Sequence, residues 1–260
     1  MQQSSISAMF GALSNEVRLD IIANNLANVN TPGYKGDKVA FQDVFQRMAT
    51  DTAPDARTAL RDKQLLPRPV ILAKPRLAMQ TVDTSQGPLE STGNVFDLAI
   101  SGPGFFRVQT PDGSFLTRNG QFYRSAQGQL VTNQGYPVLG QGGTVTIPDG
   151  GAVNITPDGN VLVNNQVIGS IDVVKAVNPA SLQKVGASLF TGSNGNAPAT
   201  QAIESGETQI YQGFLEKPNV QVVTEMLGMI EAQRSFEAYT KIISSTQDMD
   251  EKAMRVGSGM

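Results

Sequence analysis

The sequence contains no cysteine, no histidine and no tryptophan. Without cysteine the chain cannot form a disulfide bond or offer a thiolate to a substrate or a metal ion. Without histidine it lacks the commonest general base and the commonest metal ligand. Both absences argue against an enzyme, although carboxylate chemistry remains possible, and we expect no cofactor and no metal site.

Long apolar runs and an excess of one charge are also missing. Twenty basic and 23 acidic side chains leave a net charge of −3 on 260 residues, which provides no electrostatic attraction to nucleic acid or anionic lipid. No apolar run approaches the roughly 18 residues of a membrane span. Glu16, Arg18 and Asp20 interrupt the region where a secretory leader would have its apolar core. We therefore expect no nucleic acid partner, no membrane insertion and no cleaved signal peptide.

The first segment of the chain has helical periodicity. Between Ser5 and Asn28, apolar residues recur every three or four positions and so share one helix face. These residues are Ile6, Phe10, Leu13, Val17 and Ile21. Leu26 belongs to a second apolar line beside them, and Pro32-Gly33 ends the element.

Three asparagines lie near the end of this helix, and two of them, Asn24 and Asn28, continue its apolar stripe. Asparagine is a poor helix former but a good buried hydrogen-bond partner. We interpret Asn24, Asn25 and Asn28 as part of a surface that docks other helices in one register.

A second helical segment lies at the far end of the chain. We expect it to begin near Lys217, with Asn219 as the N-cap, and to end at Gly257–Gly259. Ten positions between these points follow heptad spacing, namely Val222, Met226, Met229, Gln233, Phe236, Thr240, Ile243, Gln247, Asp250 and Met254. The C-terminal helix would be roughly 50 Å long and the N-terminal one roughly 35 Å, too long to be covered by one compact β-domain.

Two interpretations of the helices remain open. An intramolecular hairpin packed on its own core would explain either helix alone. Two helices at opposite ends of the chain favour bundling between molecules, and we expect them to pair as a coiled coil that also contacts neighbouring subunits. The predicted subunit contacts are Ile6, Phe10, Leu13, Val17, Ile21, Asn24, Leu26, Asn28, Val222, Met226, Met229, Gln233, Phe236 and Ile243.

The middle of the chain changes character. Val39–Met48 fits a short helix or, nearly as well, an extended segment, and Pro54–Pro75 is punctuated by prolines as a linker or edge strand is. From 95 to 211, short apolar runs alternate with turn signals about every ten residues, which favours a mostly antiparallel sandwich or open barrel. The overall prediction is an α+β fold with a helical domain at 1–35 plus 218–260, a connecting region at 36–80 and a β-domain at 81–217.

Possible catalytic and binding groups have simpler explanations. Asp112, Asp149 and Asp158 each lie in a Pro-Asp-Gly tripeptide, where turn chemistry accounts for them better than a pair of glycosidase carboxylates. The glycines at 102–104 and 140–143 lack the spacing of phosphate-binding loops and indicate β-bends. Arginines near several aromatics suggest ordinary strand alternation, with Phe105, Phe115, Phe122 and Tyr123 inward and Arg107, Arg118 and Arg124 outward.

Several stretches together resemble one protein family. Residues 23–34 (ANNLANVNTPGY) are similar to the N-terminal signature of the bacterial flagellar rod and hook proteins. Residues 98–106 (LAISGPGFF), with 117–122 and 130–135, resemble the central β-domain of that family. Residues 213–220 (GFLEKPNV) and 229–239 (MIEAQRSFEAY) resemble its C-terminal motif. The chain length and the sequence of residues 233–241 (QRSFEAYTK) are most similar to those of the proximal-rod members of the family. The distal-rod members are the second choice.

The resemblance implies a structural subunit of the flagellar basal-body rod. Such a subunit is exported without leader cleavage by the flagellar type III apparatus into the periplasm, where it polymerises helically with itself and other rod proteins between motor and hook. The family also implies paired terminal helices inside and the β-domain outside. Its export recognition element corresponds here to Ile6, Met9, Phe10 and Leu13, although Ser14 departs from the usual spacing. A secreted β-rich carbohydrate-active enzyme and a fibre protein are the alternatives from other classes.

Overall fold

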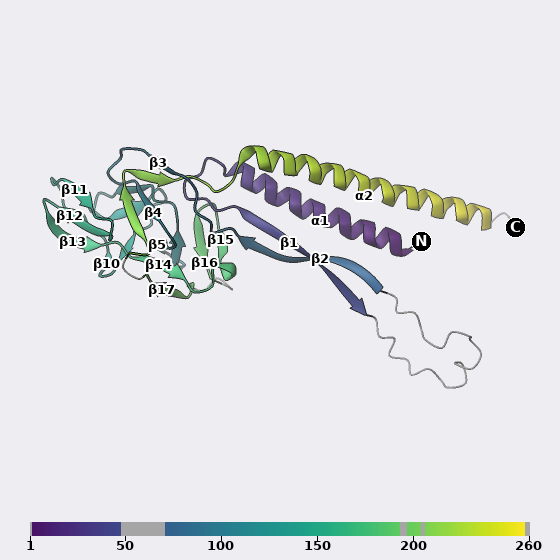
Figure 1. The fold of residues 1–260 in the computed structure, drawn as a ribbon, viewed down its shortest axis with the longest axis horizontal. Coiled ribbons are helices and arrows are strands. Elements are labelled where there is room, and N and C mark those ends of the chain that lie inside the picture. The colour runs from purple at the N-terminus through teal and green to yellow at the C-terminus, as the bar shows by residue number, and fades with distance from the viewer. Residues whose placement is uncertain (1, 48–70, 193–196, 204–205, 258–260) are drawn as a thin grey trace, which may run out of the picture. The chain divides into compact units, whose positions relative to one another are not determined.

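A computed structural model of the chain describes residues 2–47, 71–192, 197–203 and 206–257 (Figure 1). The fold is α+β, as predicted, with one helix near each end of the chain and antiparallel strands between them. The helices are α1 (Gln2–Ala27) and α2 (Val222–Gly257), and η1 (Pro179–Ser181) is a single 3-10 turn.

The strands are mostly short. They are β1 (Asp37–Arg47), β2 (Ile71–Val82), β3 (Leu89–Ser91), β4 (Leu98–Ser101), β5 (Phe105–Thr110), β6 (Gly113–Thr117), β7 (Phe122–Arg124), β8 (Leu130–Thr132), β9 (Leu139–Gly140), β10 (Gly143–Thr144), β11 (Val153–Ile155), β12 (Asn160–Val163), β13 (Gln166–Ser170), β14 (Val173–Ala176), β15 (Gln183–Val185), β16 (Leu189–Thr191), β17 (Thr200–Ala202), β18 (Gln209–Gln212) and β19 (Phe214–Glu216).

Contacts within the chain divide it into two compact units. One unit comprises 21–38 and 80–228, which include the end of α1 and the start of α2. It also contains the strands from β3 to β19, which we call the β-region. The other comprises 1–20, 39–79 and 229–260. Both long helices therefore contribute to both units.

The β-region is built around a six-stranded sheet with the order β15-β16-β6-β5-β14-β17. A three-stranded sheet, β11-β12-β13, and several two-stranded pairs complete it, and every pair with a described register is antiparallel. Its interior is dense with aromatic and branched side chains. The ring of Phe106 meets that of Phe122 edge-on, with the centroids 5.1 Å apart.

The predicted turns are present. The Pro-Asp-Gly tripeptides at 111–113 and 157–159 connect β5 to β6 and β11 to β12. Each tripeptide therefore forms the turn of an antiparallel hairpin. Asn164 and Asn165 both have positive φ, 52° and 65°, in the tight turn from β12 to β13. The glycines at 140–143 form the turn between β9 and β10. Asn119 and Gly120 lie between β6 and β7, where the carbonyl of Gly120 accepts a hydrogen bond from Leu98 N.

Three further expectations need correction or qualification. The helix considered for Val39–Met48 is wrong, because 37–47 form strand β1, which pairs with β2. Pro75 lies within β2, consistent with the extended alternative, whereas the rest of the proline-punctuated stretch, up to residue 70, lies outside the described residues. The strand alternation is correct for Phe105, Phe115 and Phe122, which are buried, but Tyr123 is exposed and Arg118 is buried.

The helix limits are close to those predicted. α1 ends at Ala27, just before the Thr-Pro-Gly turn, and α2 ends at Gly257. However, α2 begins at Val222, and the carbonyl of Gln221 accepts its first helical hydrogen bond, from Glu225 N. Asn219 is therefore not the N-cap. Its side chain accepts a hydrogen bond from Gly36 N at 2.7 Å and donates one to Asp83 O at 2.8 Å.

Candidate subunit interface

The two helices contact each other through small side chains. A Cβ atom placed on Gly11 would lie 2.6 Å from the ring of Tyr239, so glycine provides the space that this ring occupies. Arg18 forms an ion pair with Glu231 at 3.5 Å. Nearer the β-region, Gly228 contacts Ile22, since a Cβ atom there would lie 3.4 Å from its Cδ1.

Burial along the helices does not follow residue size, since Ile21 and Ile22 are buried, at 8% and 7% exposed, together with some of the alanines. Ala8 and Ala12 on α1 are only 4% and 8% exposed, and Ala232 on α2 is fully buried. Several large apolar side chains on the same helices are exposed instead. On α1, Ile6, Met9 and Leu13 are 39%, 56% and 53% exposed.

The exposed apolar side chains of α2 extend this pattern. They are Val222, Val223, Met226, Leu227, Ile230, Ile242, Met249 and Met254, of which Val223 and Leu227 are 71% and 63% exposed. Isolated apolar residues on a surface are ordinary, but a row that follows helical spacing over several turns indicates a binding face. We call Ile6, Met9 and Leu13 the outer row of α1, and Val223, Leu227 and Ile230 the outer row of α2.

The asparagine motif makes its hydrogen bonds within the chain. Asn25, which is 3% exposed, accepts from Asp37 N at 2.9 Å and donates to Asp37 O at 3.1 Å. The hydroxyl of Tyr34 donates to Asn24 at 2.8 Å. Asn28 donates to the carbonyl of Asn24 at 2.9 Å. The motif therefore shapes the turn that joins α1 to β1, a use that helical periodicity did not predict.

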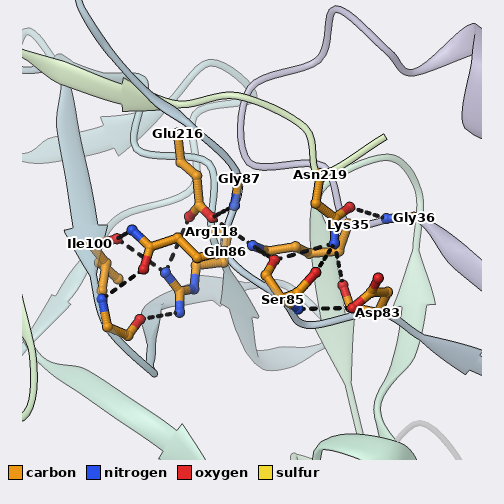
Figure 2. Close-up of polar contacts among 11 residues, drawn as sticks. Lys35, Gly36, Asp83, Ser85, Gln86, Gly87, Ile100, Arg118, Glu216 and Asn219 are labelled. Carbon is orange, nitrogen blue, oxygen red and sulfur yellow. Dashed lines mark hydrogen bonds and ion pairs between the residues drawn. The ribbon is translucent and has the colours of Figure 1, made fainter. Parts of the chain in front are cut away.

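A buried ionic cluster lies where this turn meets the β-region (Figure 2). Glu216, at the end of β19, accepts from Lys35 Nζ at 2.6 Å and from Arg118 Nη1 at 3.1 Å. The Glu216 and Lys35 side chains are fully buried, and that of Arg118 is 3% exposed. We call Lys35, Arg118 and Glu216 the ionic cluster.

Backbone groups supply further hydrogen bonds to the ionic cluster, although the buried Nε of Arg118 has no hydrogen-bond partner among the described residues. Gly87 N donates to Glu216 at 2.8 Å, and Lys35 also donates to Ser85 O at 2.7 Å. Arg118 donates to the carbonyls of Ile100 and Gly102 at 3.2 and 2.7 Å. Two cations facing one carboxylate leave an excess positive charge, and these three carbonyl oxygens are oriented to offset it. Figure 2 shows that the partners come from separate stretches of the chain.

Burial affects the ionisation of these groups. Desolvation lowers the pKa of Lys35 below its ordinary value, although the adjacent Glu216 carboxylate acts in the opposite direction. Desolvation likewise lowers the pKa of Arg118. The pKa of Tyr34 is raised by burial first, and then by the nearby carboxylates of Asp37 and Glu225.

A second set of contacts joins the turn to the six-stranded sheet. Lys184 on β15 forms an ion pair with Asp37 at 2.8 Å, and its ammonium lies 4.0 Å from the centre of the Tyr34 ring. Such a cation–π contact adds to the ion pair because both groups are largely removed from water. Burial lowers the pKa of Lys184, while Asp37 opposes that shift.

The predicted contact residues occupy different environments in the isolated chain. Ile21 is buried, and seven are half-buried, namely Phe10, Val17, Leu26, Asn28, Met229, Phe236 and Ile243. The exposed ones are Ile6, Leu13, Asn24, Val222, Met226 and Gln233. Their role as subunit contacts stays a prediction.

The ionic cluster was not predicted from the sequence. Arg118 was expected to face solvent. No local pattern links Lys35 to Glu216, because they are separated by 181 positions. A signal was nevertheless present, since each residue lies inside or beside a family-like motif: Lys35 follows 23–34, Arg118 lies in 117–122 and Glu216 in 213–220.

The described residues contain neither a metal-binding cluster nor a membrane-spanning helix. Among them, no group of three or more acidic side chains is arranged to hold a metal ion. No described helix is both long and apolar enough to cross a membrane.

Apolar rows left exposed on two long helices, in a chain whose β-region has its own buried core, are typical of an assembly protein. Three family models match the chain: "Flagella basal body rod protein" at residues 7–35, "Flagellar hook protein FlgE/F/G D1 domain" at 99–163 and "Flagellar basal body rod FlgEFG protein C-terminal" at 211–256.

Curated relatives match almost end to end. The chain is 37% identical to the flagellar basal-body rod protein FlgG of Bacillus subtilis, over 96% of this chain and 97% of that protein. It is 35% identical to the rod protein FlgF of Caulobacter vibrioides, over 95% and 96%. FlgG of Buchnera aphidicola subsp. Schizaphis graminum is 35% identical, over 93% and 95%. The chain belongs to the flagellar basal-body rod protein family and is a structural subunit of the rod, not an enzyme.

Proposed function

We propose that this subunit polymerises helically through its terminal helices. They lie within an assembling module formed by residues 1–35 and 218–260. The observation that carries the proposal is the exposure of the two outer rows on helices that contact each other at Gly11 and Gly228. Burying a large apolar side chain contributes about 1.5–3 kcal/mol. That value is for full burial, and the six side chains are 39% to 71% exposed, so each would contribute a corresponding part of it to association.

The pairing of α1 and α2 as an antiparallel coiled coil is part of this proposal. Four contacts support it: Gly11 with Tyr239, Arg18 with Glu231, Ile22 with Gly228, and Asn25 with Glu225. The two residue numbers of each pair add to 249 or 250, as expected when two helices run in opposite directions at one register. The small residues allow the helix axes to approach closely.

The ionic cluster and the contacts of Tyr34 have a mechanical role in this proposal. They attach the end of α1 and the start of α2 to the β-region at points that are buried and hydrogen-bonded. A rod must transmit torque between subunits, and a buried, multiply bonded junction resists rotation better than a flexible linker. The β-region then faces outward as the rigid part.

The placement is proposed as the proximal rod in the periplasm, after export by the flagellar type III apparatus without leader cleavage. The chain length and the sequence of residues 233–241 support proximal placement. Distal placement is the alternative. Labelled cryo-microscopy of purified basal bodies distinguishes them, because the label lies on the motor side of the rod in one case and on the hook side in the other.

Polymerisation is tested with matched charge substitutions. Leu13→Asp places a carboxylate in the outer row of α1, whereas Val177→Asp does so on the β-region at the same 53% exposure. In a flagellated strain lacking its own copy, we expect Leu13→Asp to abolish rod assembly and motility while the secreted monomer stays folded. Val177→Asp should assemble normally. Equal assembly by both variants would contradict the proposal.

A further inference from the structure

The outer rows of the two helices have mirrored spacing. On α1 the row steps by three and then four residues, from Ile6 to Met9 to Leu13. On α2 it steps by four and then three, from Val223 to Leu227 to Ile230. All six side chains are at least 39% exposed. When two helices run antiparallel, rows with opposite step order place each side chain of one row at the same height along the helix axis as a side chain of the other row.

From this match we infer that a second copy of the chain lays the outer row of its α1 against the outer row of α2, antiparallel and in one register. The inference rests on the proposed function and specifies its contact. The pairs are Ile6 with Ile230, Met9 with Leu227, and Leu13 with Val223. The residue numbers of each pair add to 236.

The direction agrees with a helical assembly. Copies related by a repeated screw operation share one polarity, because each heterologous contact is the same as the previous one. Within a chain, α1 is antiparallel to α2 at the contacts of Gly11 with Tyr239 and Arg18 with Glu231. The α1 helix of one copy must therefore also run antiparallel to α2 of the next.

The register follows from comparing the two contacts. Intramolecular pairs add to 249 or 250, and the proposed intermolecular pairs add to 236. The difference is about two heptads, which corresponds to an axial displacement of about 21 Å between copies. Because whole heptads return a helix nearly to the same face, the side chains of both helices stay level after this displacement.

Charge complementarity favours a second copy as the occupant. Glu16 and Asp20 continue the outer row of α1 and are both exposed. In the proposed register they lie opposite positions 220 and 216, beyond Val222, where α2 begins. The N-terminal end of a helix carries partial positive charge from its free N–H groups, and this effect falls off within one turn, so the Glu16 carboxylate opposite position 220 is stabilised.

Cysteine cross-linking tests the register directly, since the chain has no native cysteine. A Met9→Cys chain and a Leu227→Cys chain, carrying different tags, are produced together in a strain lacking its own copy, and isolated rods are oxidised. We expect a disulfide dimer containing both tags. The control pairs Met9→Cys with Arg234→Cys, one heptad along the same exposed face. That shift of about 10 Å exceeds the Cα separation of about 7 Å that a disulfide tolerates, and the dimer should be lost.

The outcomes separate this inference from the proposed function. Rods that assemble but join Met9→Cys to Arg234→Cys as readily as to Leu227→Cys overturn the register while leaving polymerisation intact. Rods without a mixed dimer do the same. A native chain absent from rods contradicts both.

A charge exchange provides a second measurement if the cysteine chains assemble poorly. Met9→Glu and Leu227→Lys should each abolish assembly alone, and a mixture of the two chains should restore it through the new pair. A mixture of Met9→Glu with Leu227→Glu is the control, because each should fail alone and the two facing carboxylates repel each other. Equal restoration in both mixtures overturns the register.

Discussion

The β-region and the terminal helices use apolar residues in opposite ways. In the β-region, Phe106, Phe122 and Leu130 are fully buried. On the helices Ala8, Ala12 and Ala232 are buried, while Met9 and Leu227 are 56% and 63% exposed. The β-region thus completes its own core, whereas the helices cover part of their apolar surface and leave the rest for another molecule. The β-region therefore buries its core without another molecule, whereas association would bury further apolar surface of the helices.

The largest effect is expected from emptying the β-region core. Phe106→Ala removes a fully buried ring that meets Phe122 edge-on. We expect the free energy of unfolding of the secreted monomer to fall by about 3–5 kcal/mol. Denaturant titration followed by circular dichroism measures it. A loss below about 1 kcal/mol would mean that the β-region core is less complete than its burial indicates.

Breaking the ionic cluster should cost nearly as much. Glu216→Gln removes the carboxylate that faces Lys35 and Arg118, leaving two buried cations without their counter-ion. Loss of one partner from a buried ion pair costs about 3–5 kcal/mol. Glu90→Gln is the control, because the Glu90–Lys217 pair has side chains 56% and 53% exposed. An exposed pair contributes about 0–1 kcal/mol, so equal losses in both variants would contradict the role given to the ionic cluster.

The turn after α1 offers a matched pair of glycines. Gly33 and Gly93 have nearly equal φ, +69° and +71°, but a Cβ on Gly33 would lie 2.3 Å from the backbone of Arg118, and nothing lies within 4 Å of one on Gly93. Gly93→Ala should therefore cost about 1–2 kcal/mol for conformation alone. Gly33→Ala should cost more in the same unfolding titration, since backbone must also move. Equal costs would show that close packing at Gly33 contributes nothing.

Alkaline pH tests the burial of Tyr34. Its pKa is raised above the ordinary value of 10.0, so the neutral phenol is favoured by the fold. The stabilisation that depends on this group is present below pH 10 and is lost as pH rises above it, because the unfolded chain then releases the proton first. Tyrosinate absorbance of the folded chain should show a titration step above the ordinary tyrosine range. Tyr34→Phe should remove that late step, and its persistence would exclude Tyr34 as the source.

The smallest effect on the monomer is expected on the outer row of α2. Leu227→Ala deletes a side chain that is 63% exposed, so the free energy of unfolding should change by no more than about 0.5 kcal/mol. The same variant should assemble poorly into rods, as judged by rod yield from the complemented strain. A large loss of monomer stability with normal assembly would reverse the comparison between the two regions.

Local patterns were readable along the chain. The step of three or four apolar residues predicted both long helices, and Pro32-Gly33 and Gly257 marked their ends, because helix formation and termination depend on neighbours a few residues away. The hairpin turns at 111–113 and 157–159 were predictable for the same reason. Strand β1 could not be distinguished from a helix in the sequence, since a short apolar run fits both periods.

Other features depend on residues that are distant in the sequence. Periodicity shows that Ala8 and Met9 lie on different faces of α1, but only packing decides that the alanine faces inward. Asn219 resembled a helix cap until tertiary contacts placed its side chain between Gly36 and Asp83. Lys35, Arg118 and Glu216 meet because three segments converge on one buried position. No local pattern encodes that meeting, since the energy of a buried charge depends on which opposite charge the whole fold brings beside it.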